Sequence, residues 1–80
     1  MKLAQIDRGQ SVRILGIELE PASHLRLMEL GFRRGSIIKV VETPRFAGKV
    51  ITLSGQRFAL DGKTASCIEV TTDLATAEVN

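Results

Sequence analysis

The sequence predicts a mainly β fold: a small closed barrel of five to six short antiparallel strands, with one α-helix inserted at about residues 21–30. Three observations support this fold class. Short runs of alternating apolar and polar residues recur about every 8–12 residues, with turn residues between them. Only one stretch has a helical pattern, and it lies between strands. The chain has 80 residues, which suits one small domain, and closing its sheet would remove exposed strand edges.

The N-terminal ten residues predict one short helical or 3₁₀ turn, because Leu3 and Ile6 are spaced three apart and a glycine turn follows at 7–10. The first strand is expected over residues 11–19. Its alternation changes phase around Gly16, which indicates a bulge or a bend at that glycine.

The helix is expected to begin at Pro21, since proline suits the first helical position, and to run to Leu30. Gly31 then falls at the C′ position, where a positive φ is common and glycine accepts it without strain. Phe32 would be the C″ residue and would contact Leu27, as in a Schellman closure.

At about 100° per residue, the apolar residues of this helix form two stripes. Leu27 and Leu30 lie on one side, and Leu25 and Met28 lie nearly opposite. A short helix on a small barrel buries only one side. We therefore expect the stripe of Leu25 and Met28 either to be covered within the molecule, by the loop that carries Phe46 or by the N-terminal turn, or to dock another protein.

The rest of the chain continues the strand pattern. Strands are expected over residues 36–43, 49–54, 57–60 and 67–71, joined by a loop at 43–48, a hairpin connection at 55–56 and a turn at 61–66. Residues 72–80 have weak periodicity and are expected to form a frayed strand or a loose tail. The whole chain, residues 1–80, is expected to be one domain.

Composition limits the classes of function. A single cysteine, Cys67, cannot form an internal disulfide, and no stretch approaches the roughly 20 apolar residues of a membrane span, so we expect a cytoplasmic protein. The net charge is only +2, with both signs interspersed, and the chain has three Phe and no Trp or Tyr. These features argue against a dedicated nucleic-acid binder and leave protein partners open.

The sequence offers no catalytic set and no metal cage. His24 and Cys67 are the only soft metal ligands, whereas a structural zinc site takes four. Gly62-Lys63-Thr64 resembles the end of a phosphate-binding loop, but Arg57 stands where that motif needs its first glycine. We therefore assign no catalytic, cofactor or metal residues and expect a protein that is not an enzyme. Weak or transient binding of a divalent transition metal such as Fe²⁺ stays open.

Positive charge is densest at Arg33 and Arg34, with Arg45 on the later loop. Such arginines either form a solvated loop that complements the helix dipole or a docking patch for an acidic partner. The residues that we predict to bind a partner are Leu25, Met28, Arg33, Arg34, Arg45 and Phe46.

The order of glycines and apolar residues carries a family resemblance across nearly the whole chain to about Val70. The most specific piece is Leu27-x-x-Leu30-Gly31-x-x-x-Gly35 followed by β-branched residues. The other pieces are Leu3-x-x-Ile6-x-x-Gly9, Ile14-x-Gly16, Ile38-x-Val40, Pro44 and Gly48, Gly55, Phe58-x-Leu60, and Ala65-x-x-Ile68-x-Val70. This pattern resembles the FeoA family of ferrous iron transport accessory proteins. Arg34 departs from it, since the family often has proline there, and so does the loop from Pro44 to Lys49.

The resemblance implies a small cytosolic SH3-like barrel that assists an FeoB-type membrane permease in ferrous iron uptake. The implied partner is the cytosolic GTPase portion of that permease, and no nucleic acid. The alternative is a metal-responsive regulatory domain that binds a divalent transition metal, because the same SH3-like domain occurs attached to metal-dependent transcription regulators. A shared fold alone does not decide between these functions.

Overall fold

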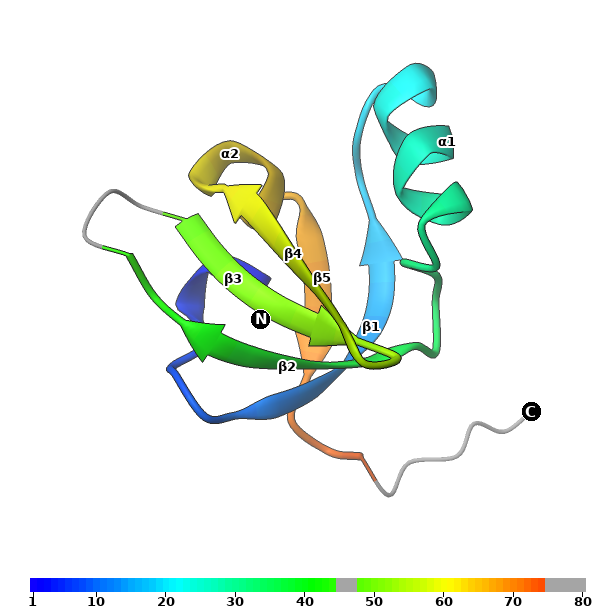
Figure 1. The fold of residues 1–80 in the computed structure, drawn as a ribbon. Helices are drawn as coiled ribbons and strands as arrows, with labels where there is room; N and C mark the ends of the chain where they lie inside the picture. The colour runs from blue at the N-terminus through cyan, green and yellow to red at the C-terminus, as the bar shows by residue number, and fades with distance from the viewer. Residues whose placement is uncertain (45–47, 75–80) are drawn as a thin grey trace.

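A computed structural model describes residues 1–44 and 48–74 of the chain (Figure 1). The elements in order are η1 (Leu3–Gln5), β1 (Ser11–Ile17), α1 (Pro21–Glu29), β2 (Ile37–Glu42), β3 (Gly48–Leu53), β4 (Gln56–Asp61), α2 (Gly62–Ala65) and β5 (Ile68–Thr71). The strands form one antiparallel sheet in the order β4-β3-β2-β1-β5. The predicted fold class is confirmed: five antiparallel strands with one inserted helix, α1.

The core lies inside the curl of the sheet, where β3 and β4 cross in front of β5 (Figure 1). Alternate residues of the strands point into it, as a period of two requires. Burial removes apolar surface from water, which is the main source of stability for such a domain. The buried side chains are Leu3, Ile6, Val12, Ile14, Leu27, Phe32, Ile38, Val40, Ile51, Leu53, Ala65, Ile68 and Val70.

The two edge strands of the sheet, β5 and β4, differ in what lies along their outer sides. β5 is covered on its outer side by the N-terminus, since Lys2 bridges to Glu69 and the N–H of Val70 donates to the Met1 carbonyl over 2.8 Å. β4 pairs with β3 alone within the described residues. The sheet therefore curls as a barrel does, but among residues 1–44 and 48–74 its ladder does not close, and the edge at β4 has no strand partner.

The end of α1 has the predicted Schellman closure. The N–H of Gly31 donates to the Met28 carbonyl (3.0 Å), and the N–H of Phe32 donates to the Leu27 carbonyl (2.9 Å), with Gly31 at φ 105°. Phe32 is fully buried and meets Phe58 edge to face, with ring centroids 5.1 Å apart. α1 is thus fixed to the sheet by its last turn.

The predicted irregularity of the first strand is a β-bulge. The pairing of β1 with β5 shifts register between Ile14 and Gly16, so Leu15 is the extra residue and its side chain is exposed. Opposite the bulge, the N–H of Gly35 donates to the Ile14 carbonyl (2.7 Å) and the N–H of Ile14 donates to the Ser36 carbonyl (2.8 Å). These bonds hold the loop after α1 against the bulge.

Two connections differ from the prediction. The hairpin between β3 and β4 turns at Ser54 and Gly55, one residue earlier than expected, because both have positive φ (52° and 83°), as a type I′ turn requires. The turn at 61–66 contains a short α-helix, α2, because the Asp61 carboxylate accepts a hydrogen bond from the N–H of Thr64 (2.7 Å) and caps it. Residues 75–80, most of the predicted tail, lie outside the described residues.

Candidate functional site

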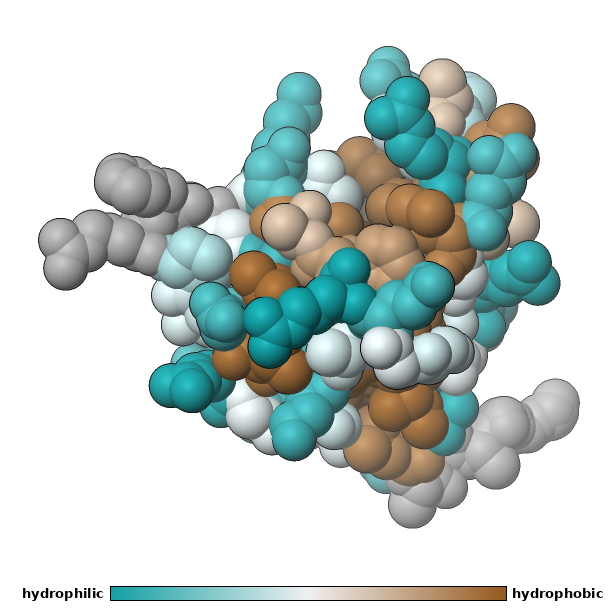
Figure 2. Space-filling model, in the orientation of Figure 1, coloured by the Kyte–Doolittle hydropathy of each residue, from teal (hydrophilic) through white to brown (hydrophobic). Residues whose placement is uncertain are grey.

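A groove of about 360 Å³ runs between the bulge of β1, one face of α1 and the loop after α1. We call it the α1 groove. On the face seen in Figure 2, apolar surface extends from the region of α1 towards the middle of the molecule. The residues that line the α1 groove are Leu15, Gly16, Ile17, His24, Met28, Arg33 and Arg34.

The apolar part of the groove comes from side chains that the core leaves out. Met28 is 39% exposed, because the last turn of α1 meets the sheet through Leu27, which lies about 100° around the helix from Met28. Leu15 is 43% exposed because the bulge turns it outward. An adaptable thioether beside a branched aliphatic side chain is a surface that suits an apolar contact from another molecule.

The basic part of the groove sits on a rigid loop. The N–H of Ser36 donates to the Arg33 carbonyl (2.9 Å), and the Ser36 hydroxyl donates to the Gly31 carbonyl (3.0 Å). The Arg13 guanidinium donates to the Gly35 carbonyl (3.0 Å). The side chains of Arg33 and Arg34 are exposed, and neither joins an ion pair with another described residue. Two exposed guanidinium groups, carried on a loop whose backbone is hydrogen-bonded, therefore border the groove without a carboxylate partner in the described chain.

The structure brings together three of the predicted partner-binding residues, Met28, Arg33 and Arg34. Leu25 is 57% exposed on α1 but does not line the groove. Arg45 and Phe46 lie outside the described residues. Their part in a partner contact stays a prediction.

Two features of the helix stripes were not foreseen. Leu30, expected beside Leu27 on the buried side, is 46% exposed, because it is the C-cap residue and the chain turns away there. η1 packs against β5 and α2, so the N-terminal turn does not cover Met28. Sequence reasoning also missed Leu15 and His24. The phase change at Gly16 was the available signal for Leu15, since a bulge exposes its extra residue.

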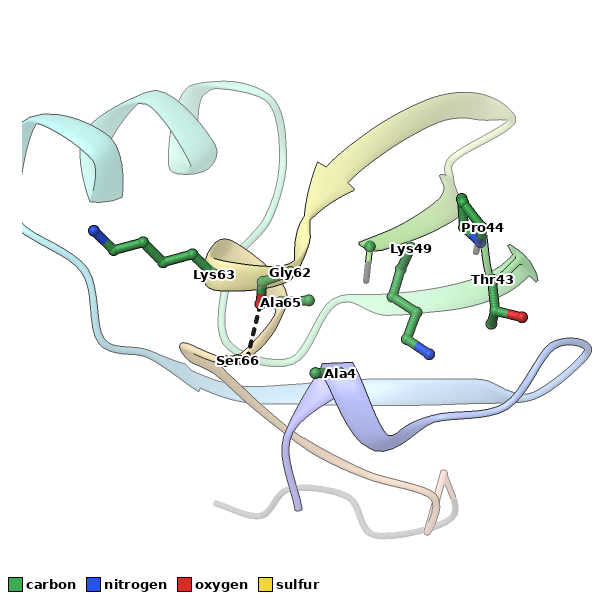
Figure 3. A pocket seen from close by; sticks show the side chains of 9 residues that line it. Ala4, Thr43, Pro44, Lys49, Gly62, Lys63, Ala65 and Ser66 are labelled. Atoms are coloured by element: carbon green, nitrogen blue, oxygen red, sulfur yellow. Dashed lines mark hydrogen bonds between the residues drawn. The ribbon is translucent and has the colours of Figure 1, made fainter. Parts of the chain in front are cut away.

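A second cavity of about 470 Å³ lies between η1, the start of β3 and α2 (Figure 3). Lys49 and Lys63 both line it. The Lys49 ammonium donates to the Ile6 carbonyl (2.9 Å), and the Lys63 side chain points away from Lys49. The two charges therefore do not converge on one ligand.

Perturbed carboxyl groups lie outside both cavities. The N-terminal ammonium and Lys2 hold the pKa of Glu69 below its usual value, at distances of 2.7 and 3.1 Å. Hydrogen bonds from Thr64 lower the pKa of Asp61. Both shifts accompany structural contacts, the N-terminal clamp and the cap of α2. They give no sign of a catalytic acid or base.

Within residues 1–44 and 48–74, no three His, Cys, Asp or Glu side chains gather as a metal site would require. His24 lines the groove, and Cys67 is half-buried just before β5. Over the same part of the chain, no helix has the length and apolar character to span a membrane.

Comparison with known proteins gives the family. The FeoA domain model matches residues 1–72. The chain belongs to the FeoA family. Membership of this family implies involvement in ferrous iron transport. A search of curated proteins gives no match.

Solved FeoA structures share the fold. FeoA from Chlorobium tepidum is 28% identical with a TM-score of 0.81, over 88% of this chain and 68% of that one. The iron(II) transport protein A from Clostridium thermocellum is 28% identical with a TM-score of 0.80; the match covers 88% of this chain but only 44% of that protein. Stenotrophomonas maltophilia FeoA, complexed with zinc, is 25% identical with a TM-score of 0.77, over 89% of both chains. That protein is described as a procaryotic SH3 domain protein, with a suggested role as a ferrous iron transport activating factor. The predicted SH3-like fold is confirmed.

Proposed function

We propose that this FeoA protein is a non-enzymatic, cytosolic accessory protein of ferrous iron uptake. It binds the cytosolic GTPase portion of an FeoB-type permease and modulates transport through that contact. Membership of the FeoA family supports a role in ferrous iron uptake. The α1 groove supports action through contact with a protein partner. The predictions of no cofactor requirement and of a cytosolic location belong to this proposal.

The observation that carries the proposal is that two exposed apolar side chains, Met28 and Leu15, line the same groove as Arg33 and Arg34. An interface of this kind would place an apolar partner side chain in the groove and acidic partner groups near the guanidiniums. The apolar contact would supply most of the affinity, and the charges would speed association and orient the partner. α1 suits this role because its own anchoring uses another side of the helix, through Leu27.

The apolar contact is tested by calorimetric titration of the permease's GTPase portion. Met28→Glu places a charge in the groove and is expected to weaken binding at least ~10-fold, the effect of losing a central interface residue. Leu30→Glu is the matched control, since Leu30, the C-cap of the same helix, has similar exposure but does not line the groove. It should leave the dissociation constant within about 2-fold, a change too small to indicate a lost hot spot. Equal affinity of Met28→Glu and the parent protein would rule out this contact.

The charges are tested by the double change Arg33→Glu and Arg34→Glu. We expect a lower association rate and a weaker dependence of that rate on salt, because exposed charges act mainly through steering. Lys39→Glu with Lys63→Glu changes the net charge equally at exposed positions outside the α1 groove. If both double variants associate alike, the basic loop has no specific part in binding.

A second candidate function is a metal-responsive regulatory domain that binds a divalent transition metal. The zinc held by the Stenotrophomonas maltophilia protein favours it. Anaerobic titration calorimetry with Fe²⁺ separates the two candidates. Stoichiometric binding at micromolar concentration supports the sensor, and heats no larger than those of dilution support the accessory protein.

A further inference from the structure

β4 is an outer strand of the sheet, with β3 as its only neighbouring strand in the described chain (Figure 1). The opposite edge, on β5, is covered by the N-terminus. An uncovered edge offers a row of N–H and C=O groups to another strand. We propose that β4 pairs with β4 of a second copy of this chain, antiparallel, about a twofold axis at Ala59.

The hairpin turn decides which backbone groups of β4 point outward. Ser54 and Gly55 form a two-residue turn, with Leu53 directly opposite Gln56. In such a turn the N–H of Gln56 points to β3, and the direction then alternates along the strand. The register runs along β4 without a shift. The backbone groups that point away from β3 are therefore those of Arg57, Ala59 and Asp61.

Several antiparallel registers would place the outward backbone groups of the two β4 strands opposite each other. The charges on β4 favour one of them. With the axis at Ala59, Arg57 of each copy lies opposite Asp61 of the second copy, so one favourable pair occurs twice. An axis at Arg57 or at Asp61 would oppose like charges. An axis at Phe58 would leave Arg57 opposite the uncharged Ala59, and an axis at Leu60 would leave Asp61 opposite Ala59.

The Asp61 carboxylate uses Oδ1 to cap α2, and its second oxygen can accept from a guanidinium. Arg57 already forms an exposed ion pair with Glu42 of its own chain through Nη1 (3.4 Å), and its other N–H groups would serve the Asp61 of the second copy.

The other face of β4 is compatible with the same register. Phe58 and Leu60 are half-buried and pack against the core, and this register places Phe58 opposite Leu60 of the second copy. The two would form a close, non-hydrogen-bonded pair. Ala59, at the axis, is small enough for the strands to approach. Pairing extends over only six residues, so we expect weak, concentration-dependent association.

Sedimentation at increasing protein concentration tests the inference. The series should reach ~1 mM, because a dissociation constant above that value would mean only a very weak binding free energy. The average mass should rise from 8.7 kDa towards twice that value. Ala59→Pro removes an outward N–H while the ladder to β3 stays intact, and it should keep the protein monomeric. Ala59→Ser retains the N–H and should associate like the parent protein. A parent protein that stays monomeric throughout would overturn the inference, and so would a folded Ala59→Pro variant that still dimerises.

Two further pairs of variants, each a test and its control, decide the question if Ala59→Pro does not fold. Arg57→Glu places like charges opposite each other twice and should raise the dissociation constant at least ~10-fold, whereas Arg57→Lys should change it little. Ala59→Cys in a Cys67→Ser background should form an interchain disulfide on mild oxidation, because hydrogen-bonded antiparallel partners have Cα atoms about 5.5 Å apart. Lys39→Cys in the same background is the control and should stay reduced. Equal association of Arg57→Glu and Arg57→Lys, or equal cross-linking at positions 39 and 59, would overturn the proposed register.

Discussion

At the scale of single residues, Gly31 and Phe32 decide how α1 ends and where the groove forms. Gly31 at φ 105° allows the chain to reverse, and its N–H satisfies the Met28 carbonyl. Phe32 then enters the core against Phe58. Both roles were predictable, because a glycine after a helical pattern and an apolar residue behind it are local signals. The exposure of Leu30 was not predictable, since a helical wheel does not show where the helix leaves the sheet.

Gly31→Ala is expected to lower the free energy of unfolding by about 1–3 kcal/mol, because a Cβ there combines a strained φ with a close contact. That Cβ would lie 3.2 Å from Cδ2 of Leu53. Gly9→Ala is the control: Gly9 has a similar φ of 92° but nothing within 4 Å of its added Cβ. Urea denaturation of both variants should show the larger loss for Gly31→Ala. Equal losses would mean that the contact with Leu53 contributes nothing.

At the scale of elements, the strands followed from alternation, whereas the groove depended on contacts between distant segments. The bulge near Gly16 was predicted, but the sequence could not show that the Ile14 carbonyl accepts from Gly35 and so brings the basic loop beside Leu15. Local sequence patterns also predicted the β3–β4 hairpin, but they placed its turn one residue too late and so did not predict the strand register. Serine at a positive φ is uncommon, so Ser54 was expected in the strand rather than in the turn.

The hairpin gives a prediction at this scale. Ser54→Asn is expected to raise the free energy of unfolding by about 0.5 kcal/mol, because Asn-Gly is the favoured pair of a type I′ turn. Ser54→Val should lower it, since a β-branched residue is strained at φ 52°. Thermal denaturation of the two variants checks both signs. A rise with Val and a fall with Asn would contradict the turn geometry.

At the scale of the whole molecule, charge contacts tie the N-terminus to β5 of the sheet. The lowered pKa of Glu69 means that its folded form binds a proton less readily than its unfolded form. Its contribution to stability is therefore fully present above the unfolded pKa of about 4.3, and it is lost as pH falls through the lower folded value. Asp61 acts in the same direction through Thr64. Lys2, whose pKa Glu69 raises, contributes below its unfolded pKa of about 10.4, and that contribution is lost at higher pH.

Glu69→Gln should therefore reduce the pH dependence of stability on the acid side. The urea midpoints of Glu69→Gln and the parent protein should differ most above about pH 5 and should converge as pH falls. Because these groups are exposed, the difference should also shrink in high salt. Parallel midpoint curves from pH 7 to pH 3 would show that the N-terminal clamp contributes nothing through charge.

We propose that the α1 groove binds the GTPase portion of the permease. The most direct test is an NMR titration that follows the amide chemical shifts of isotope-labelled FeoA protein as the unlabelled GTPase portion is added. We predict the largest shifts or losses of signal at residues 15–17, at Met28 and at Arg33 and Arg34, with small changes around Lys49 and Lys63. Shifts concentrated on the second cavity or on β4, with the groove unchanged, would contradict the proposed docking site.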